Sequence, residues 1–200
     1  MKFLIIFSLT INLCCLNAQH YPTISKIRNN EILKIHPLGF LNKAKVGYEY
    51  AHNTELSFGL EFALFYFLFE GYRISPFTRL YFSESCPKGF YFQIQGFFFN
   101  IKNKIVFNDN TSVTNSVYYK KASGLGGGVG LGYQFIFGKS QNVSLDIMLG
   151  LKNLPVSERA YYAKHITSNG EIFEIDNTSL WYLIGPGSFL NNQICIGLMF

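Results

Sequence analysis

Residues 55–66 read ELSFGLEFALFY, and apolar residues occupy every second position from Leu56 to Tyr66. The positions between them, from Glu55 to Ala63, carry small or acidic residues. Because successive side chains of a β-strand point to opposite faces, this stretch predicts a strand with one apolar and one polar face. A strand of a membrane barrel alternates in this way between lipid and a polar lumen. A water-facing sheet would carry more lysine and glutamate on its polar face.

The same alternation recurs in two later stretches. Residues 142–152 alternate between aliphatic side chains and mostly small or polar ones, and residues 123–138 alternate between large apolar side chains and glycines. In a narrow barrel, small inward residues make room for their neighbours, and glycine lets a strand bend as the sheet closes. We therefore expect these glycines to face the lumen: Gly124, Gly126, Gly128, Gly130 and Gly132.

The composition is unusual for a water-soluble domain, since aromatic residues make up 18% of the chain and charged residues only 14%. After the N-terminal segment, no apolar run approaches the roughly 20 residues that a membrane helix needs. Lipid admits only helices and closed barrels as spanning structures. We therefore predict an all-β fold, an antiparallel up-and-down transmembrane barrel of about eight strands. The predicted strands are Asn30–His36, Lys43–Ala51, Glu55–Tyr66, Tyr72–Ser83, Phe90–Phe107, Ser123–Gly138, Asn142–Lys152 and Asn191–Phe200.

The predicted connections differ in length at the two ends of the barrel. Residues 53–54, 85–89 and 139–141 form tight turns, whereas residues 108–115 cap an extended hairpin and residues 153–190 form a long loop. Short turns at one end and long loops at the other are typical of outer-membrane barrels.

The N-terminus predicts export. Lys2 is followed by an apolar run from Phe3 to Leu16, which is typical of a signal peptide over residues 1–18, and the barrel domain then covers residues 19–200. The segment that we expect to be cleaved includes Cys14 and Cys15, and the residues before them do not suit lipid attachment. The two remaining cysteines, Cys86 and Cys195, are expected to stay unpaired.

Several charged residues fall on faces that we assign to the lumen, where an isolated charge is costly. Opposite charges should therefore pair across the lumen and fill it, because side chains nearly fill an eight-stranded barrel. The alternative is a gated or narrow conducting path. The predicted lumen charge network is Lys45, Glu49, Glu61, Arg73, Arg79, Asp146 and Lys152.

The end of the chain carries a specific resemblance. Its last strand places Ile194, Ile196, Leu198 and Phe200 on one face, which is similar to the C-terminal assembly signal of bacterial outer-membrane proteins. The chain resembles the small eight-stranded barrels of the OmpA, OmpX and OmpW kind. Within that class, residues 34–39 together with residues 47–50 resemble an uncharacterised family of such barrels. The resemblance implies a Gram-negative outer membrane as the location, and membrane lipid and the barrel-assembly machinery as partners.

The sequence leaves the role of the barrel open. We expect a structural or surface-interaction role first, in which the outer loops, including Glu158–Asp176 with a hairpin tip at residues 168–170, contact a partner or extracellular ligand. A narrow pore for small solutes is the alternative. A lipid-modifying enzyme would use His165 with Ser157 and Glu158 in the last loop. A soluble secreted barrel would instead enclose an apolar ligand.

Other chemistry has little support in the sequence. The net charge is +5, but the basic residues are scattered, so we expect no nucleic-acid partner. The histidines show no metal-binding spacing, and the glycines of residues 124–132 are not followed by the helix that a phosphate loop needs. We expect no metal, no cofactor and no enzymatic activity.

Overall fold

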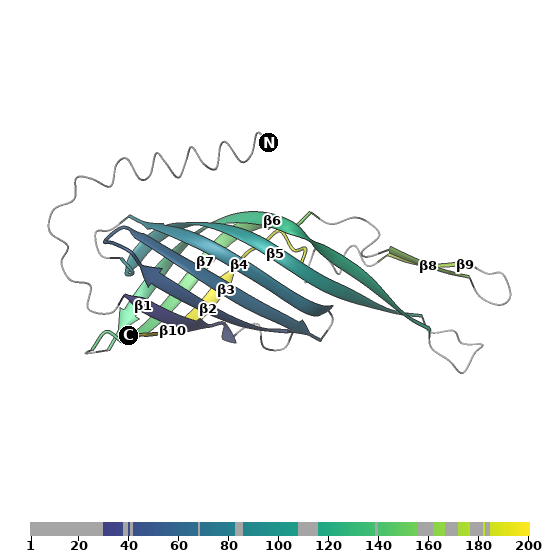
Figure 1. Cartoon of the computed structure of the whole chain (residues 1–200), viewed down its shortest axis with the longest axis horizontal. Helices are drawn as coiled ribbons and strands as arrows, with labels where there is room; N and C mark the ends of the chain where they lie inside the picture. The colour runs from purple at the N-terminus through teal and green to yellow at the C-terminus, as the bar shows by residue number, and fades with distance from the viewer. Residues whose placement is uncertain are drawn as a thin grey trace, which may run out of the picture.

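The computed structural model describes residues 30–37, 40, 42–67, 69–82, 86–107, 116–138, 140–155, 162–166, 172–176, 182 and 185–200; for residues 103–107, 116–120, 162–166 and 172–176 it describes the backbone alone. Within these residues, eight strands close into one antiparallel barrel and two more form a separate hairpin (Figure 1). The barrel strands are β1 (Glu31–Ile35), β2 (Lys43–Ala51), β3 (Leu56–Tyr66), β4 (Phe69–Tyr81), β5 (Gly89–Phe107), β6 (Ser116–Phe137), β7 (Val143–Asn153) and β10 (Gln193–Met199). The hairpin strands are β8 (Tyr162–Ile166) and β9 (Ile172–Asp176).

The barrel closes between its first and last strands. The order around the wall is β1-β10-β7-β6-β5-β4-β3-β2, and β1 pairs with β10 so that Ile32 lies opposite Met199. Each barrel strand therefore has a hydrogen-bonded neighbour on both sides. A sheet in lipid requires this closure, because lipid offers no partner to backbone polar groups. The predicted fold class, an all-β antiparallel up-and-down barrel of eight strands, is confirmed.

The strand bounds differ from the predicted ones mainly at two places. β4 begins at Phe69 rather than Tyr72, and β6 begins at Ser116 rather than Ser123. β5 and β6 remain paired from Gly89 to Phe107 and extend past the other strands (Figure 1). Backbone pairing continues there beyond the stretch where alternation marks a lipid-facing wall, so periodicity alone could not locate the start of β6. The described residues contain no helix that is long and apolar enough to cross a membrane.

The two faces of the wall separate apolar from polar side chains as predicted. The outward side chains are large and apolar and remain exposed, with Leu125 at 70% and Leu149 at 66%. The inward side chains are buried, and many are charged or polar. A soluble barrel that encloses an apolar ligand would have the reverse arrangement. The three predicted outward sets are exposed except for the half-buried Leu56, Tyr133 and Leu145; they run from Leu56 to Tyr66 on β3, from Leu125 to Phe137 on β6 and from Val143 to Leu151 on β7.

The two ends of the barrel differ in their connections. The turn end carries the start of β1, the end of β10 and the short connections at residues 52–55, 82–88 and 138–142. The loop end carries the connections at residues 36–42, 108–115 and 154–192. The connection between β3 and β4, residues 67–68, is also at the loop end, so that end is not uniformly long as the predicted pattern implied.

Glycine allows the closest approach of neighbouring strands in the wall. A Cβ atom placed at Gly128 would lie 2.7 Å from the carbonyl oxygen of Leu151 and 3.1 Å from the Phe97 ring, so only glycine allows β6 to approach its neighbours this closely. Cys86 lies in the turn before β5, where it is buried as a free thiol, and burial raises its pKa. Cys195, on β10, is also free and buried.

Candidate functional site

Four charged side chains meet in the lumen near the turn end, and we call them the lumen plug: Lys34 on β1, Glu49 on β2, Arg79 on β4 and Asp146 on β7. The Lys34 ammonium is paired with Glu49 and lies 2.7 Å from Asp146 Oδ2. Arg79 Nη1 lies 2.9 Å from Glu49 Oε2, and Arg79 Nη2 lies 2.7 Å from Asp146 Oδ2. Each cation thus contacts both anions, and the plug joins four strands across the lumen.

Neutral side chains add further hydrogen bonds to the lumen plug, although the side-chain nitrogen of Gln134 is itself buried without a partner. Gln134 Oε1 accepts from Lys34 at 2.7 Å and from Arg79 Nη1 at 2.9 Å. The Ser57 hydroxyl donates to Glu49 at 2.6 Å, and Tyr81 donates to the same oxygen at 2.9 Å. Asp146 accepts from the Tyr91 hydroxyl. The remaining contacts of Arg79 are a hydrogen bond from Nε to Gln93 (2.7 Å) and ring contacts with Tyr91 (4.1 Å) and Phe77 (4.9 Å).

The lumen plug is electrically neutral, with two cations and two carboxylates, all at most 2% exposed. Moving a charge out of water is costly, and only a close partner with further hydrogen bonds offsets the cost. Since all four charges have such partners, the plug is a stable filling for the turn-end half of the lumen. Ion-paired side chains therefore occupy the part of the lumen that water would have to fill in a conducting path.

The middle of the lumen contains a second, smaller ion-pair group around Glu61 on β3. Its carboxylate lies 2.7 Å from Lys45 Nζ, and its Oε1 lies 3.5 Å from His36 Nε2. Gln95 Nε2 donates to Glu61 at 2.6 Å, and Gln95 Oε1 accepts from Asn191 at 3.0 Å. This group links β2, β3 and β5 with the segment that enters β10.

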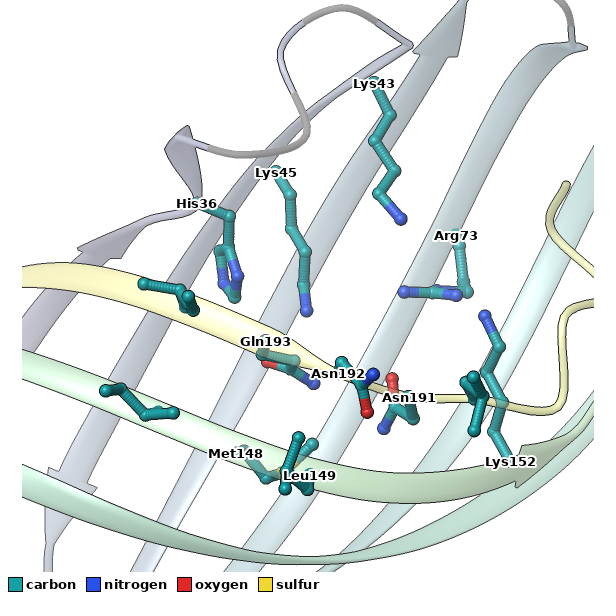
Figure 2. Close-up of a pocket in the computed structure, with 13 residues that line it drawn as sticks. His36, Lys43, Lys45, Arg73, Met148, Leu149, Lys152, Asn191, Asn192 and Gln193 are labelled. Carbon is teal, nitrogen blue, oxygen red and sulfur yellow. The ribbon is translucent and has the colours of Figure 1, made fainter. Parts of the chain in front are cut away.

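Toward the loop end the lumen becomes strongly cationic. Lys43, Arg73 and Lys152 point into the same space as Lys45 (Figure 2). Among the described residues, the ion pairs include none of these three side chains. A cavity of about 390 Å³ separates them, and we call it the cationic chamber. Its polar lining is His36, Lys43, Lys45, Arg73, Lys152, Asn191, Asn192 and Gln193.

Arg73 is the most unusual residue of the cationic chamber. It is 2% exposed, and its Nε and Nη1 atoms have no hydrogen-bond partner. Its guanidinium carbon lies 5.0 Å from the centre of the Phe97 ring, on the side where an apolar cluster fills the lumen. The side-chain nitrogen of Gln193 is likewise buried without a partner. The chamber therefore contains hydrogen-bond donors that no described protein group satisfies. The apolar cluster consists of Ala63, Phe65, Phe69, Phe97, Phe99, Ile101, Ala122 and Leu154.

The structure places all seven residues of the predicted charge network in the lumen. It divides them between the lumen plug (Glu49, Arg79, Asp146), the Glu61 group (Lys45, Glu61) and the cationic chamber (Lys45, Arg73, Lys152). The expectation that opposite charges pair does not hold for Arg73 and Lys152, because the carboxylates of the network lie deeper in the lumen and already have partners.

Sequence reasoning missed Lys34, His36 and Lys43 as lumen residues. Lys34 and His36 alternate with the exposed Leu33 and Ile35, so the period of two did place them inward. The signal was weak because β1 has only five residues. Lys43 is the first residue of β2, and at the end of a strand the alternation pattern does not fix the direction of the side chain.

The remaining predicted features lie at the edges of the barrel or outside the described residues. The predicted assembly residues Ile194, Ile196, Leu198 and Phe200 are exposed on the outward face at the end of the chain. Residues 1–18, Ser157 and Glu158 are not described, and of His165 the backbone alone is described. β8 and β9 pair from Tyr162 opposite Asp176 to Ile166 opposite Ile172, on either side of the predicted hairpin tip. No group of three or more metal-ligating side chains is found among the described residues.

A closed antiparallel barrel with an apolar exterior and a packed, charged lumen defines the class of small membrane-type β-barrels. The chain belongs to the family described as "Protein of unknown function (DUF3575)", whose model matches residues 9–182. Among solved structures, it is similar to the N-terminal β-barrel domain of Pseudomonas aeruginosa OprF, with 12% identity and a TM-score of 0.42 over 86% of this chain and 98% of that chain. The comparison with curated proteins gave no match.

Proposed function

We propose that the chain is an outer-membrane β-barrel of a Gram-negative bacterium with a structural or surface-interaction role and a lumen that does not conduct. The membrane location is supported by the outward face, where exposed leucine, isoleucine, valine and phenylalanine side chains cover the wall. Such a face is stable in lipid and would aggregate in water. Membrane lipid and the barrel-assembly machinery are the partners that this proposal implies, the latter through the final strand that ends at Phe200.

The observation that carries the non-conducting role is the lumen plug. A pore needs a continuous path for water, but near the turn end the lumen is filled by the buried side chains of the lumen plug, Lys34, Glu49, Arg79 and Asp146. Opening a path would separate charges that have no other partner of opposite sign nearby, which is costly at low dielectric. The barrel is therefore suited to be a rigid wall rather than a channel.

Fractionation followed by conductance measurement tests this proposal. We expect the expressed protein to be recovered with the outer membrane and to change its gel mobility on boiling in detergent. After purification and reconstitution in planar lipid bilayers, we expect no discrete conductance steps above those of a protein-free bilayer. Regular steps that change in size when Glu49 or Arg79 is replaced would establish the pore alternative. Recovery as a soluble secreted protein would contradict the membrane location.

Deleting the hairpin of β8 and β9 distinguishes a structural role from a surface-interaction role. These strands pair only with each other and not with the barrel wall. Deleting residues 158–176 should therefore leave the barrel folded, with an unchanged unfolding midpoint in detergent.

The deletion variant can then be expressed in a strain that lacks the protein, and the resistance of the cell envelope to detergent can be measured. If the role is structural, we expect full restoration of this resistance, equal to that given by the intact chain. Failure of the folded variant to restore it would assign the role to the surface hairpin.

A further inference from the structure

The cationic chamber has more basic side chains than the described residues neutralise. Lys43, Lys45, Arg73 and Lys152 line it, and Glu61 is the carboxylate that lies in ion-pair contact with them, through Lys45. Among the described side chains, four basic groups therefore face one carboxylate around this cavity. The lumen plug, which lies deeper in the lumen, is by contrast neutral, with two cations and two anions. The two halves of the lumen are therefore built differently.

The second observation is the set of buried donors without partners. Arg73 Nε and Nη1 and the side-chain nitrogen of Gln193 are buried and unsatisfied, although both residues line the cavity. A buried donor without an acceptor is costly, and a guanidinium more so because it stays charged at every accessible pH. The cavity volume of about 390 Å³ gives room for an acceptor beside these donors. A ligand that supplies several acceptor oxygens and negative charge would satisfy both the charge excess and the donors.

We propose that the cationic chamber binds a phosphate group. A phosphate monoester carries about −1.5 to −2 charges at neutral pH and three acceptor oxygens, which suits three unpaired cations better than the single charge of a carboxylate does. Arg73 supplies the buried donors, Lys43 and Lys152 approach from opposite walls, and Lys45 stays shared with Glu61. The lining of the chamber also includes Ile147, Leu149 and Ile194, whose side chains are exposed on the outward face, so the cavity reaches the wall between β7 and β10. The site is independent of the structural role proposed above.

The ligand chemistry has two sources, a free phosphate or the headgroup of a lipid, and the experiment has one arm for each. The full chain is refolded in a non-ionic sugar detergent without phosphate, and inorganic phosphate is titrated while the thermal unfolding midpoint is recorded. In the second arm, the midpoint is measured in phosphatidylcholine vesicles with and without phosphatidic acid. A rise in the midpoint in the first arm assigns the site to free phosphate, and a rise in the second arm alone assigns it to a lipid headgroup.

The decisive variant is Arg73→Gln, and its matched control is Lys121→Gln. Lys121 is an exposed cation on β6, so the control removes the same charge outside the chamber. We expect Arg73→Gln to weaken binding by about tenfold or more, as losing a charge-assisted hydrogen bond does. The control should bind as the wild type does.

The unfolding temperature measured without an anion is a second readout, and it keeps the test valid whatever the stability of the variant. Without an anion, Arg73→Gln should unfold at the same temperature as the wild type or higher, because it removes a buried charge that has no carboxylate partner among the described side chains. With phosphate, the wild type should become the more stable of the two. The proposal is overturned if neither phosphate nor phosphatidic acid shifts the wild-type midpoint. It is also overturned if the two variants lose binding equally, since that would indicate unspecific attraction by net charge.

Discussion

Replacing Arg79 by methionine is expected to lower the free energy of unfolding of the barrel by about 3–5 kcal/mol. The guanidinium is 1% exposed and lies 2.9 Å from Glu49 and 2.7 Å from Asp146. Its removal leaves two buried carboxylates with Lys34 as the one remaining cation of the lumen plug. Methionine keeps most of the apolar volume, so the loss reports on charge rather than on an empty cavity. A urea titration in detergent micelles, followed by circular dichroism, measures it.

The matched control is the double variant Arg79→Met with Asp146→Asn. It removes one cation and one anion, so the lumen plug stays neutral with Lys34 and Glu49. We expect its cost to be smaller than the sum of the two single costs by about 0.5–3 kcal/mol, the range for side chains in one network. Costs that add within error would mean that Arg79 and Asp146 do not stabilise each other, and the electrostatic account of the plug would be wrong.

Replacing Leu149 by arginine is expected to destabilise the membrane-inserted barrel by about 2–4 kcal/mol, the cost of a cation on the lipid face near the bilayer midplane. Leu149 lies in the wall strand β7, is 66% exposed on the outward face and also borders the cationic chamber. In lipid this exposure means contact with acyl chains, where a guanidinium has no partner. The measurement is the folded fraction after insertion into phosphatidylcholine vesicles, read from the gel mobility of unboiled samples at increasing urea.

The control at this site is Leu149→Met, which keeps an apolar side chain of similar volume and should insert as the wild type does. A second comparison uses a lipid-free refolding mixture in a non-ionic detergent, where flexible micelles accommodate the charge more easily and the arginine variant should fold more completely. Equal stability of the arginine and methionine variants in vesicles would show that this face does not contact lipid, and the membrane assignment would be wrong.

The strands and their faces were predictable because the signal is local. Alternation with a period of two depends only on neighbouring residues, and residues 55–62 show it without interruption. The lumen position of Glu49, Arg79 and Asp146 follows from the same rule, since each alternates with outward apolar residues. The start of β6 was not predictable, because the pairing of residues 116–122 with β5 extends the hairpin without that pattern.

Two arginines on one strand show what the alternation pattern cannot predict. Arg73 and Arg79 both lie on β4, both face the lumen, and the sequence alone assigns them the same role. In the structure Arg79 lies between two carboxylates, whereas Arg73 lies over the Phe97 ring among other cations. The two arginines differ because the carboxylates of β2 and β7, Glu49 and Asp146, lie at the depth of Arg79 and not at the depth of Arg73.

The sequence by itself thus determined the fold class, the faces of the longer strands and most of the charged side chains that enter the lumen, because the alternation pattern is local to each strand. The tertiary structure alone decided which charges meet. Asp146 reaches Arg79 and Lys34 across the lumen from strands that are distant in sequence, at depths set by the stagger of all eight strands on closure. The same stagger leaves Lys43, Arg73 and Lys152 together around one cavity, because no strand carries a carboxylate to their level among the described residues.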